Sequence, residues 1–229
     1  MGVVDVGELH LVPARADGIA GIVEISGRAG LGIADDGDAA GDAGAVRRAD
    51  QPDEIRHAIE TFLTLEASGW KGRERTAMVI DRYRAAFARE AVHLLAERDL
   101  CRIHTLVLNN HALAALVVFV EAGVAYTWKT AYDENYAAFS PGTLLMIEVT
   151  KTHLEDPNIA ATDSCAVPDH PVMSRLWSER RRIGTFVVGL TPESERLAHQ
   201  AAGQIHFHRE ARNALRILRN RVRRLLTGG

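Results

Sequence analysis

Hydrophobic and polar residues follow one another with a changing period, and that period predicts where helices and strands lie. Ile55, Ile59 and Phe62 recur three or four residues apart, the spacing of one helix face. From residue 103 to residue 133 apolar residues instead form short runs or alternate with polar ones, as in strands. The predicted helices are one that begins at Pro52 and ends before Gly69, then 76–98, 143–155, 172–180 and 193–226, and the predicted strands are 103–108, 112–120, 126–133, 159–163 and 184–190.

Short turn motifs separate these elements and define the fold class. Asn109-Asn110 is typical of a hairpin turn, and Ala122-Gly123 indicates a second turn between strands. Helices come first, followed by a meander of strands, a crossover helix and further strands. This order predicts an α/β fold with a sheet of mixed direction.

The helix predicted over residues 76–98 has a clear apolar face, with its arginines on the other side. We expect the apolar residues to point into the core. They are Met78, Ile80, Tyr83, Phe87, Val92 and Leu95.

Residues 1–46 differ in composition from the rest of the chain. They contain ten of the 19 glycines and no aromatic residue, since the first aromatic is Phe62. A segment that is mostly Gly, Ala and Asp buries too little apolar surface to offset the entropy of ordering it. We therefore predict three regions: an irregular leader over residues 1–46, a folded domain over residues 47–192, and a C-terminal helix over residues 193–229.

Composition narrows the class of protein. The 229 residues suffice for one substantial domain, and 47% hydrophobic with 25% charged residues is typical of a globular protein. The net charge of −3 gives no overall attraction to nucleic acid. Two cysteines, Cys101 and Cys165, fit a reducing compartment, and no apolar run is long enough to span a bilayer. With no secretory signal pattern, we expect a cytoplasmic protein.

The C-terminal helix is basic and amphipathic. Leu215, Leu218 and Val222 are three and four residues apart, and seven arginines with one glutamate lie between Arg209 and Leu226. Such a helix binds an anionic membrane surface or nucleic acid, or it packs on protein with its arginines in solvent. Because the rest of the chain is slightly acidic, we favour a protein partner, keep membrane-surface contact as an alternative, and expect no nucleic-acid partner.

Ser140-Pro141-Gly142 stands where the strand that carries Tyr126 gives way to a helix. A sharp corner there points the unpaired N–H groups of the helix outward, and such groups attract phosphate. An ordinary Ser N-cap explains the same spacing, and spacing alone favours the cap.

Five sequence blocks together resemble a known family. They are Glu66-Ala-Ser-Gly-Trp-Lys-Gly72, Lys129-Thr-Ala-Tyr-Asp133, Ser140-Pro-Gly142, Asp163-Ser-Cys165 and Leu176-Trp-Ser-Glu-Arg-Arg-Arg-Ile183. In this order they resemble the GNAT-type acyltransferases of the CelD/FemAB-like group, which are associated with cellulose and polysaccharide biosynthesis. The resemblance covers about residues 47–192. It implies a mixed, mostly antiparallel GNAT sheet flanked by helices, and transfer of an acyl group to an amine or hydroxyl.

The resemblance also implies acyl-CoA as the donor. The glycine-rich loop that usually holds the pyrophosphate is absent, and Ser140, Pro141, Gly142 and Thr143 take its place. Only one glycine is present, and proline removes one N–H donor.

Three residues are candidates for the chemistry of transfer. Asp163 ends a strand and is either a general base or a carboxylate that orients the acceptor, or it is the cap of a turn. Tyr132 is either the proton donor to the departing thiolate or a rim aromatic. Lys129 is either a contact to a phosphate or polarised carbonyl, or a solvated strand lysine.

Three further residues are candidates for binding the acceptor, a small molecule or sugar. Trp70-Lys71 lies between glycines and either grips a sugar or nucleotide or closes a helix as an apolar plug. His170 lies in a loop and is a candidate for binding the acceptor, with a catalytic role as the alternative. Cys165 has no histidine partner that would support a nucleophile, and the ten histidines show no metal-ligand spacing, so we predict no metal.

The resemblance thus implies an acyl-CoA-dependent acyltransferase, with a sugar amine, hydroxyl or other small acceptor used in envelope or polysaccharide assembly. Two alternatives remain open: a FemAB-like transferase that uses aminoacyl-tRNA, and a catalytically silent GNAT-like module that docks through its C-terminal helix.

Overall fold

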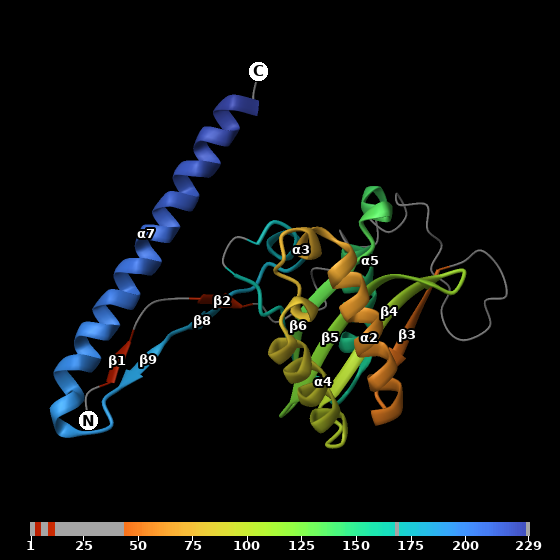
Figure 1. Cartoon of the computed structure of the whole chain (residues 1–229), viewed down its shortest axis with the longest axis horizontal. Helices are drawn as coiled ribbons and strands as arrows, with labels where there is room; N and C mark the ends of the chain where they lie inside the picture. The colour runs from red at the N-terminus through yellow and green to blue at the C-terminus, as the bar shows by residue number, and fades with distance from the viewer. Residues whose placement is uncertain (1–2, 6–8, 12–43, 168–169, 228–229) are drawn as a thin grey trace. The chain divides into compact units, whose positions relative to one another are not determined.

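A computed structural model describes residues 3–5, 9–11, 44–167 and 170–227. It divides into two compact units, shown in Figure 1. The sheet unit comprises Leu11–Arg180, and the tail unit comprises Met1–His10 with Arg181–Gly229. Residues 12–43, most of the predicted leader, lie outside the described residues.

The sheet unit is built on five strands in the order β3-β4-β5-β6-β7. Their bounds are β3 Ala45–Ala49, β4 Cys101–Leu108, β5 His111–Glu121, β6 Val124–Tyr132 and β7 Ala161–Asp163. The first four are antiparallel neighbours, and β7 alone pairs in parallel, with β6. The predicted class, a mixed and mostly antiparallel sheet flanked by helices, is confirmed.

Both predicted turns between strands are present. Asn109 and Asn110 have φ of 49° and 61°, the left-handed pair that a two-residue hairpin turn requires. Ala122 and Gly123, with φ of 49° and 76°, join β5 to β6 in the same way. These turns fix the register of the three central strands.

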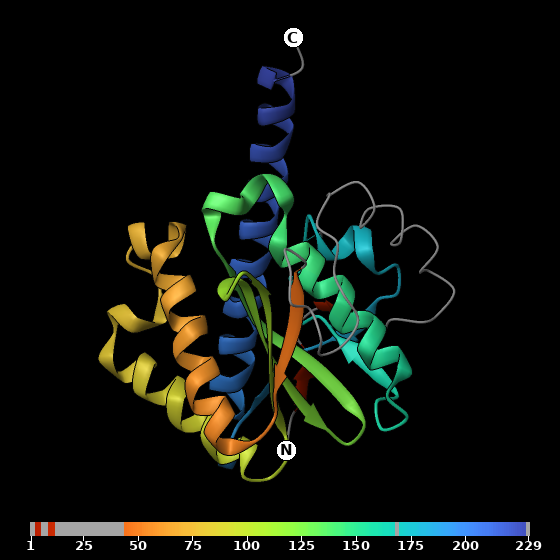
Figure 2. The same ribbon diagram turned by 90° about the vertical axis from the view of Figure 1, so that its right-hand side faces the viewer.

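Helices cover both faces of the sheet (Figure 2). Helices α2 (Pro52–Ser68) and α4 (Arg82–Ala96) lie on one face, and α5 (Pro141–Glu155) lies on the other. The carboxylate of Asp81 starts α4 by accepting from the N–H groups of Tyr83 and Arg84, at 2.8 and 3.2 Å. Short helices α3 (Trp70–Arg73), η2 (Met78–Ile80), η3 (Glu134–Phe139) and α6 (Met173–Leu176) connect the larger elements.

The core consists of two apolar layers separated by β5. Leu116 and Val118 belong to the layer under α5, whereas Ala115 and Val117 belong to the layer under α2 and α4. Because alternate residues of a strand point to opposite faces, β5 is apolar at nearly every position and buried on both sides.

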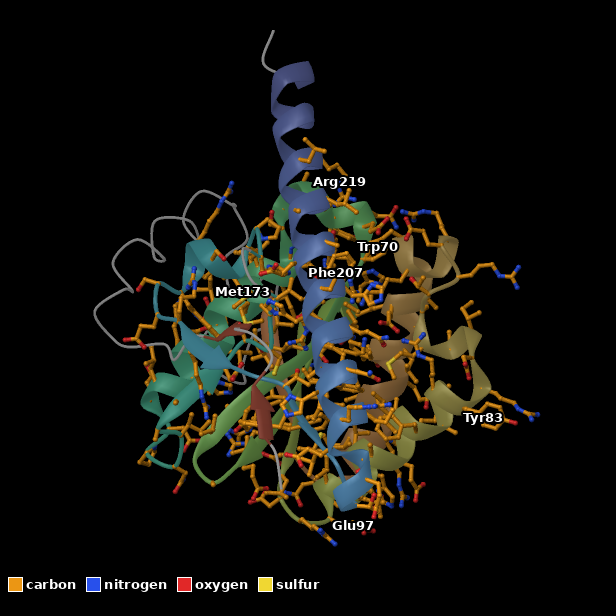
Figure 3. All side chains as sticks on the ribbon, turned by 90° about the vertical axis from the view of Figure 1, so that its left-hand side faces the viewer. Trp70, Tyr83, Glu97, Met173, Phe207 and Arg219 are labelled. Atoms are coloured by element: carbon orange, nitrogen blue, oxygen red, sulfur yellow. The ribbon has the colours of Figure 1, made fainter. Side chains whose placement is uncertain are left out.

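One predicted face was wrong. In the helix expected over residues 76–98, Met78 and Val92 are buried, but Ile80, Tyr83 and Phe87 are 49%, 70% and 62% exposed. The α-helix begins only at Arg82, after the separate turn η2, and it packs through small residues, including Ala85 and Ala88. Tyr83 therefore lies on the outer side of α4, as Figure 3 shows.

The tail unit contains the predicted C-terminal helix, α7 (Glu195–Thr227), and short strand pairs. Strand β1 (Val3–Asp5) pairs with β9 (Phe186–Val188), and β2 (Leu9–Leu11) pairs with β8 (Arg181–Ile183). Ala198 and Ala202 of α7 are buried. A short turn, η4 (Pro192–Ser194), precedes the helix. Among the described residues, no helix is both long and apolar enough to cross a bilayer.

Candidate functional site

A cavity of the sheet unit opens where two parallel strands diverge. Strands β6 and β7 pair only from Val124 to Tyr126 and from Ala161 to Asp163. Beyond that point β6 continues to Tyr132, while the chain after Asp163 leaves the sheet. The space between them, together with the start of α5, forms a cavity of about 560 Å³.

Most of the residues predicted for the site line this cavity. They are Trp70, Lys71, Lys129, Tyr132, Ser140, Gly142, Thr143 and His170. Pro141 and Asp163 are buried beside the cavity and are not part of its lining. Segments separated by up to a hundred residues in sequence thus meet around one space.

A β-bulge shapes the strand that forms one wall. Val117 of β5 pairs with Lys129, whereas Val118 pairs with Thr127, so Trp128 is an extra residue without a partner position. Such a bulge turns the backbone of the strand and re-aims the neighbouring groups. The bulge therefore sets the direction of the wall formed by Thr127, Trp128 and Lys129, all of which line the cavity.

The turn before α5 offers fewer N–H groups than its sequence suggests. Ser140 has φ 52° and ψ 50°, and its side chain does not cap the helix. Its carbonyl instead accepts from the N–H groups of Thr143 and Leu144, at 2.9 and 3.1 Å. Since Pro141 has no N–H, Gly142 supplies the N–H group of this described turn that is left for a ligand.

Tyr132 lies against the same turn. A Cβ atom on Gly142 would be 3.4 Å from Cδ1 of Tyr132 and 3.6 Å from Cγ2 of Thr130. The close approach of β6 to the first turn of α5 places Tyr132 and Gly142 at the same end of the cavity.

The opposite wall turns sharply at Asp163. Its Oδ1 accepts from the N–H of Cys165 at 2.7 Å, and Cys165 has φ 49°. Partial desolvation of the thiol and the neighbouring carboxylate of Asp163 raise the pKa of Cys165 to about 12, which keeps it protonated at neutral pH. Asp163 therefore fixes the turn that brings Ser164 and Cys165 to the cavity.

His170 is held by its neighbours. Its Nδ1 accepts from the N–H groups of Val172 and Met173, at 3.3 and 3.2 Å, and burial lowers its pKa. The ring thus caps the start of α6 as a neutral imidazole. Met173, labelled in Figure 3, lines the cavity next to it.

Trp70 and Lys71 are positioned by two close contacts. A Cβ on Gly72 would lie 1.7 Å from the carbonyl oxygen of Ala67, so only glycine lets α3 fold back on the end of α2. Glu134 of η3 then accepts from the N–H of Trp70 and from Nη2 of Arg73, each at 2.6 Å. Together these contacts orient α3 toward the cavity.

Glu66 is the important residue that sequence reasoning missed. It follows Ile55, Ile59, Phe62 and Leu63 at helical spacing, so a charged residue on the buried face of α2 was the available signal. Its side chain is 1% exposed and reaches both Lys71 and Lys129. Burial acts to raise its pKa, but the N–H of Met78 and the two ammonium groups outweigh burial and hold the pKa below its usual value.

No group of three or more potential metal ligands is found among the described residues. A family model of an acetyltransferase (GNAT) domain matches residues 35–163. No curated protein matches the chain.

Several solved structures are distantly similar. A possible acetyltransferase from Clostridium difficile 630 is 14% identical, with 57% of this chain and 84% of that chain covered and a TM-score of 0.42. An aminoglycoside acetyltransferase, meta-AAC0020, from an uncultured soil sample and in complex with sisomicin is 14% identical, with coverages of 65% and 97% and a TM-score of 0.43.

A third structure is the C-terminal domain of a protein named as a lysylphosphatidylglycerol synthetase from Agrobacterium fabrum. It is 14% identical with a TM-score of 0.46, and 71% of this chain spans 47% of that chain. The family assignment rests on the match over residues 35–163, which is more than half of the chain.

The mixed, mostly antiparallel sheet and this match define the class of protein. The chain belongs to the acetyltransferase (GNAT) domain family.

Proposed function

We propose that the chain transfers an acyl group from acyl-CoA to the amine or hydroxyl of a small acceptor. The observation that supports this most is the cavity between β6 and β7, with Gly142 at one end and the bulged wall along its length. A cavity of about 560 Å³ is large enough for an extended thioester arm together with an acceptor.

The donor lies with its phosphates at the turn of Ser140, Gly142 and Thr143, where a helix N-terminus favours negative charge. Its amide-bearing arm runs along the free edge of β6 from Tyr132 toward Thr127. The β7 side is closed by Ser164 and Cys165. In this arrangement the reacting carbonyl lies beside the bulge, away from Gly142.

Transfer is direct. The lone pair of the acceptor's nitrogen or oxygen attacks the thioester carbonyl, the carbon–sulfur bond breaks, and the CoA thiolate leaves and takes up a proton. The acceptor loses one proton, which the carboxylate of Asp163, buried beside the cavity, receives. The raised pKa of Cys165 argues against a covalent acyl-cysteine intermediate.

The five sequence blocks support a finer placement in the CelD/FemAB-like group, with a sugar or other small acceptor in polysaccharide or envelope assembly. The two cysteines support a cytoplasmic site of action, where thiols stay reduced. A second function, docking on a protein partner, is supported by α7. Leu215 and Leu218 are exposed on that helix, and Phe207 (Figure 3) is exposed about two to three turns earlier.

The first test is binding of the donor. Titration calorimetry with acetyl-CoA, and with a longer acyl-CoA, should show saturable binding by the parent protein. Release of free thiol in the presence of amine or hydroxyl acceptors should then report turnover. A folded parent that gives no heat with millimolar acetyl-CoA would contradict the proposed enzyme and leave docking as the supported function.

A second test concerns Asp163. In Asp163→Asn the amide oxygen still accepts from the N–H of Cys165, so the turn and the melting temperature should be unchanged. The amide cannot take up a proton, so kcat should fall about tenfold while the Kd of acetyl-CoA stays the same. An unchanged kcat would show that Asp163 acts only as the cap of its turn and not as the general base. Asp163→Ala, which removes the cap as well, separates the two roles through its loss of stability.

A further inference from the structure

Lysine is rare in this chain and is concentrated at the cavity. The sequence contains three lysines among 27 basic residues, so arginine supplies nearly all of the positive charge. Two of the three, Lys71 and Lys129, line the cavity and meet at one buried carboxylate, that of Glu66. They come from different elements, α3 and β6, and from two separate sequence blocks.

The contacts of Glu66 use both of its oxygens. Its Oε1 is 2.9 Å from Nζ of Lys71 and 3.7 Å from Nζ of Lys129. Its Oε2 accepts from the N–H of Met78 at 2.8 Å. The carboxylate therefore holds two ammonium groups on the same side and has little capacity left for a further donor.

The two ammonium groups have N–H donors left for a ligand. Each has three N–H donors, and Glu66 accepts a hydrogen bond from Lys71 but is 3.7 Å from Lys129, an ion pair without a hydrogen bond. The side chains of Lys71 and Lys129 are 26% and 25% exposed, and this exposed part faces the cavity they line. Donors that are partly desolvated and already oriented are a favourable arrangement for an anion.

Charge at this wall is not balanced. Two ammonium groups face one carboxylate, and Arg84 of α4 adds a further positive charge that acts on Lys129. Burial, Lys71 and Arg84 together lower the pKa of Lys129 despite the opposing effect of Glu66. A purely structural ion pair would need one lysine, because the second adds repulsion that Glu66 compensates only in part.

Two indole rings flank the ammonium groups. Nζ of Lys71 is 6.0 Å from the ring centroid of Trp70, and Nζ of Lys129 is 5.6 Å from that of Trp128. Both rings line the cavity, so a bound molecule finds flat apolar surfaces beside the charges. That combination suits a small organic anion better than a hydrated inorganic ion.

We propose that Lys71 and Lys129 form an anion subsite that binds the carboxylate or phosphate of the acceptor, with Glu66 as the residue that positions both lysines. The subsite rests on the proposed function, and it narrows the acceptor to molecules that carry an anionic group besides the reacting amine or hydroxyl. The donor's own phosphates have a separate place at the Gly142 turn.

The subsite can be tested without turnover. In protein labelled with ¹³C,¹⁵N-lysine, the three lysines give three side-chain Cε–Nζ signals, which Lys71→Met, Lys129→Met and Lys151→Met assign. Inorganic phosphate and γ-aminobutyrate should shift the signals of Lys71 and Lys129 saturably. Lys151 pairs with Glu148 on α5 outside the cavity, so its signal should stay in place.

The second test of the subsite measures turnover. Acceptors are compared in matched pairs: phosphoethanolamine with ethanolamine, and γ-aminobutyrate with butylamine, each with acetyl-CoA. The parent should favour the anionic member at least tenfold in kcat/KM, mainly through KM. Lys71→Met and Lys129→Met should each remove most of that preference, and Lys151→Met should keep it. Glu66→Gln should weaken the preference while acetyl-CoA still binds.

The outcomes separate the two proposals. If anions shift the lysine signals but the protein binds no acetyl-CoA, the anion subsite would be supported and the proposal that acyl-CoA is the donor would be contradicted. Equal turnover of anionic and neutral acceptors, with lysine signals that do not move, would overturn the subsite and leave the acyltransferase intact. Signals that move with CoA but with neither phosphate nor γ-aminobutyrate would assign the anion to the donor and also overturn the subsite.

Discussion

Lowering the pH from 6.5 to 4.5 should remove roughly 4 to 5 kcal/mol of unfolding free energy through two buried histidines. This is less than the limiting rate of about 1.4 kcal/mol for each pH unit and each ring, because the unfolded rings are only half protonated at pH 6.5. His104 of β4 and His153 of α5 lie between the sheet and the helix, with ring centroids 6.0 Å apart. A loss of this size is comparable to the whole stability of many domains, so we expect unfolding in mild acid.

Stability falls as the pH falls because the two rings bind protons more weakly in the folded state than in the unfolded state. Burial lowers the pKa of His104 to about 3, assisted by the charges of His153, Arg48 and Arg102. Burial lowers the pKa of His153 to about 4, and Arg102 acts in the same direction while Asp156 opposes it. In the unfolded chain both rings have a pKa near 6.5, so the unfolded state binds more protons between pH 6.5 and 4. The stability is therefore complete above pH 6.5 and is lost as the pH falls.

The hydrogen bonds of the two histidine rings also favour their neutral forms. Nδ1 of His153 is 3.1 Å from Oγ1 of Thr162, whereas Nε2 of each ring is buried without a hydrogen-bond partner in the described structure. Protonation would add a buried charge with nothing to receive its new N–H.

Urea unfolding at pH 7.5, 6, 5 and 4.5 measures the effect. His104→Leu should reduce the slope of stability against pH by about half, because one of the two titrating rings is gone. His199→Leu, at an exposed position of α7, should leave the slope unchanged. A parent whose unfolding free energy is flat between pH 7 and pH 5 would contradict the assignment.

The elements that sequence predicts well are those determined locally. Asn109-Asn110 and Ala122-Gly123 place left-handed residues next to apolar strands, and both turns are found as predicted. The helix after Ser140 begins two residues earlier than predicted because Pro141 is compatible with the first turn of a helix. The strand expected over 184–190 shortens to β9, since few neighbours are available for pairing in the tail unit.

Burial that depends on a distant partner could not be predicted. Tyr83 and Phe87 have the right spacing for a core face, yet α4 meets α2 through alanines, so the large side chains remain outside. Periodicity shows that a helix has two faces, and it does not show which face has a partner close enough for bulky residues.

The candidate site shows the same limit. Ser140, Gly142, Lys129 and Trp70 each lie in a recognisable block, and the divergence of β6 from β7 brings them around one cavity. Glu66 went unrecognised because its role depends on Lys129, 63 positions away in the chain, and on the fold-back of α3 at Gly72. Hydrogen bonding at Ser140 also differs from a simple cap, since its backbone carbonyl rather than its side chain starts the helix.

Changing Gly142 to valine should weaken acetyl-CoA binding about 100-fold, the loss of roughly 2.7 kcal/mol. Of the first-turn groups of α5, the N–H of Gly142 is the one left for a phosphate, so a branched side chain at this residue blocks its approach. The position of the side chain can be read from the structure. A Cβ here would point at Tyr132 and Thr130, which also line the cavity.

Gly142→Ala is the matched control. A single Cβ would lie 3.4–3.9 Å from its neighbours, which is ordinary van der Waals contact, and the helix gains a better helix former. The Gly142→Ala variant should therefore bind acetyl-CoA with a Kd within about threefold of that of the parent, because alanine adds no branch that reaches the N–H group. Melting temperatures of both variants should stay within a few degrees of the parent, so that a loss of binding is not a loss of fold.

Calorimetry with acetyl-CoA and with CoA separates the phosphate contact from the acyl contact. Gly142→Val should weaken the binding of both ligands by the same factor, because the blocked contact is made by the phosphates that the two ligands share. A valine variant that binds acetyl-CoA as tightly as the parent would show that the phosphates do not lie at this turn. The donor would then enter the cavity from the side of Val167 and His170, and the positive charge of Lys71 and Lys129 would be the next place to look for its phosphates.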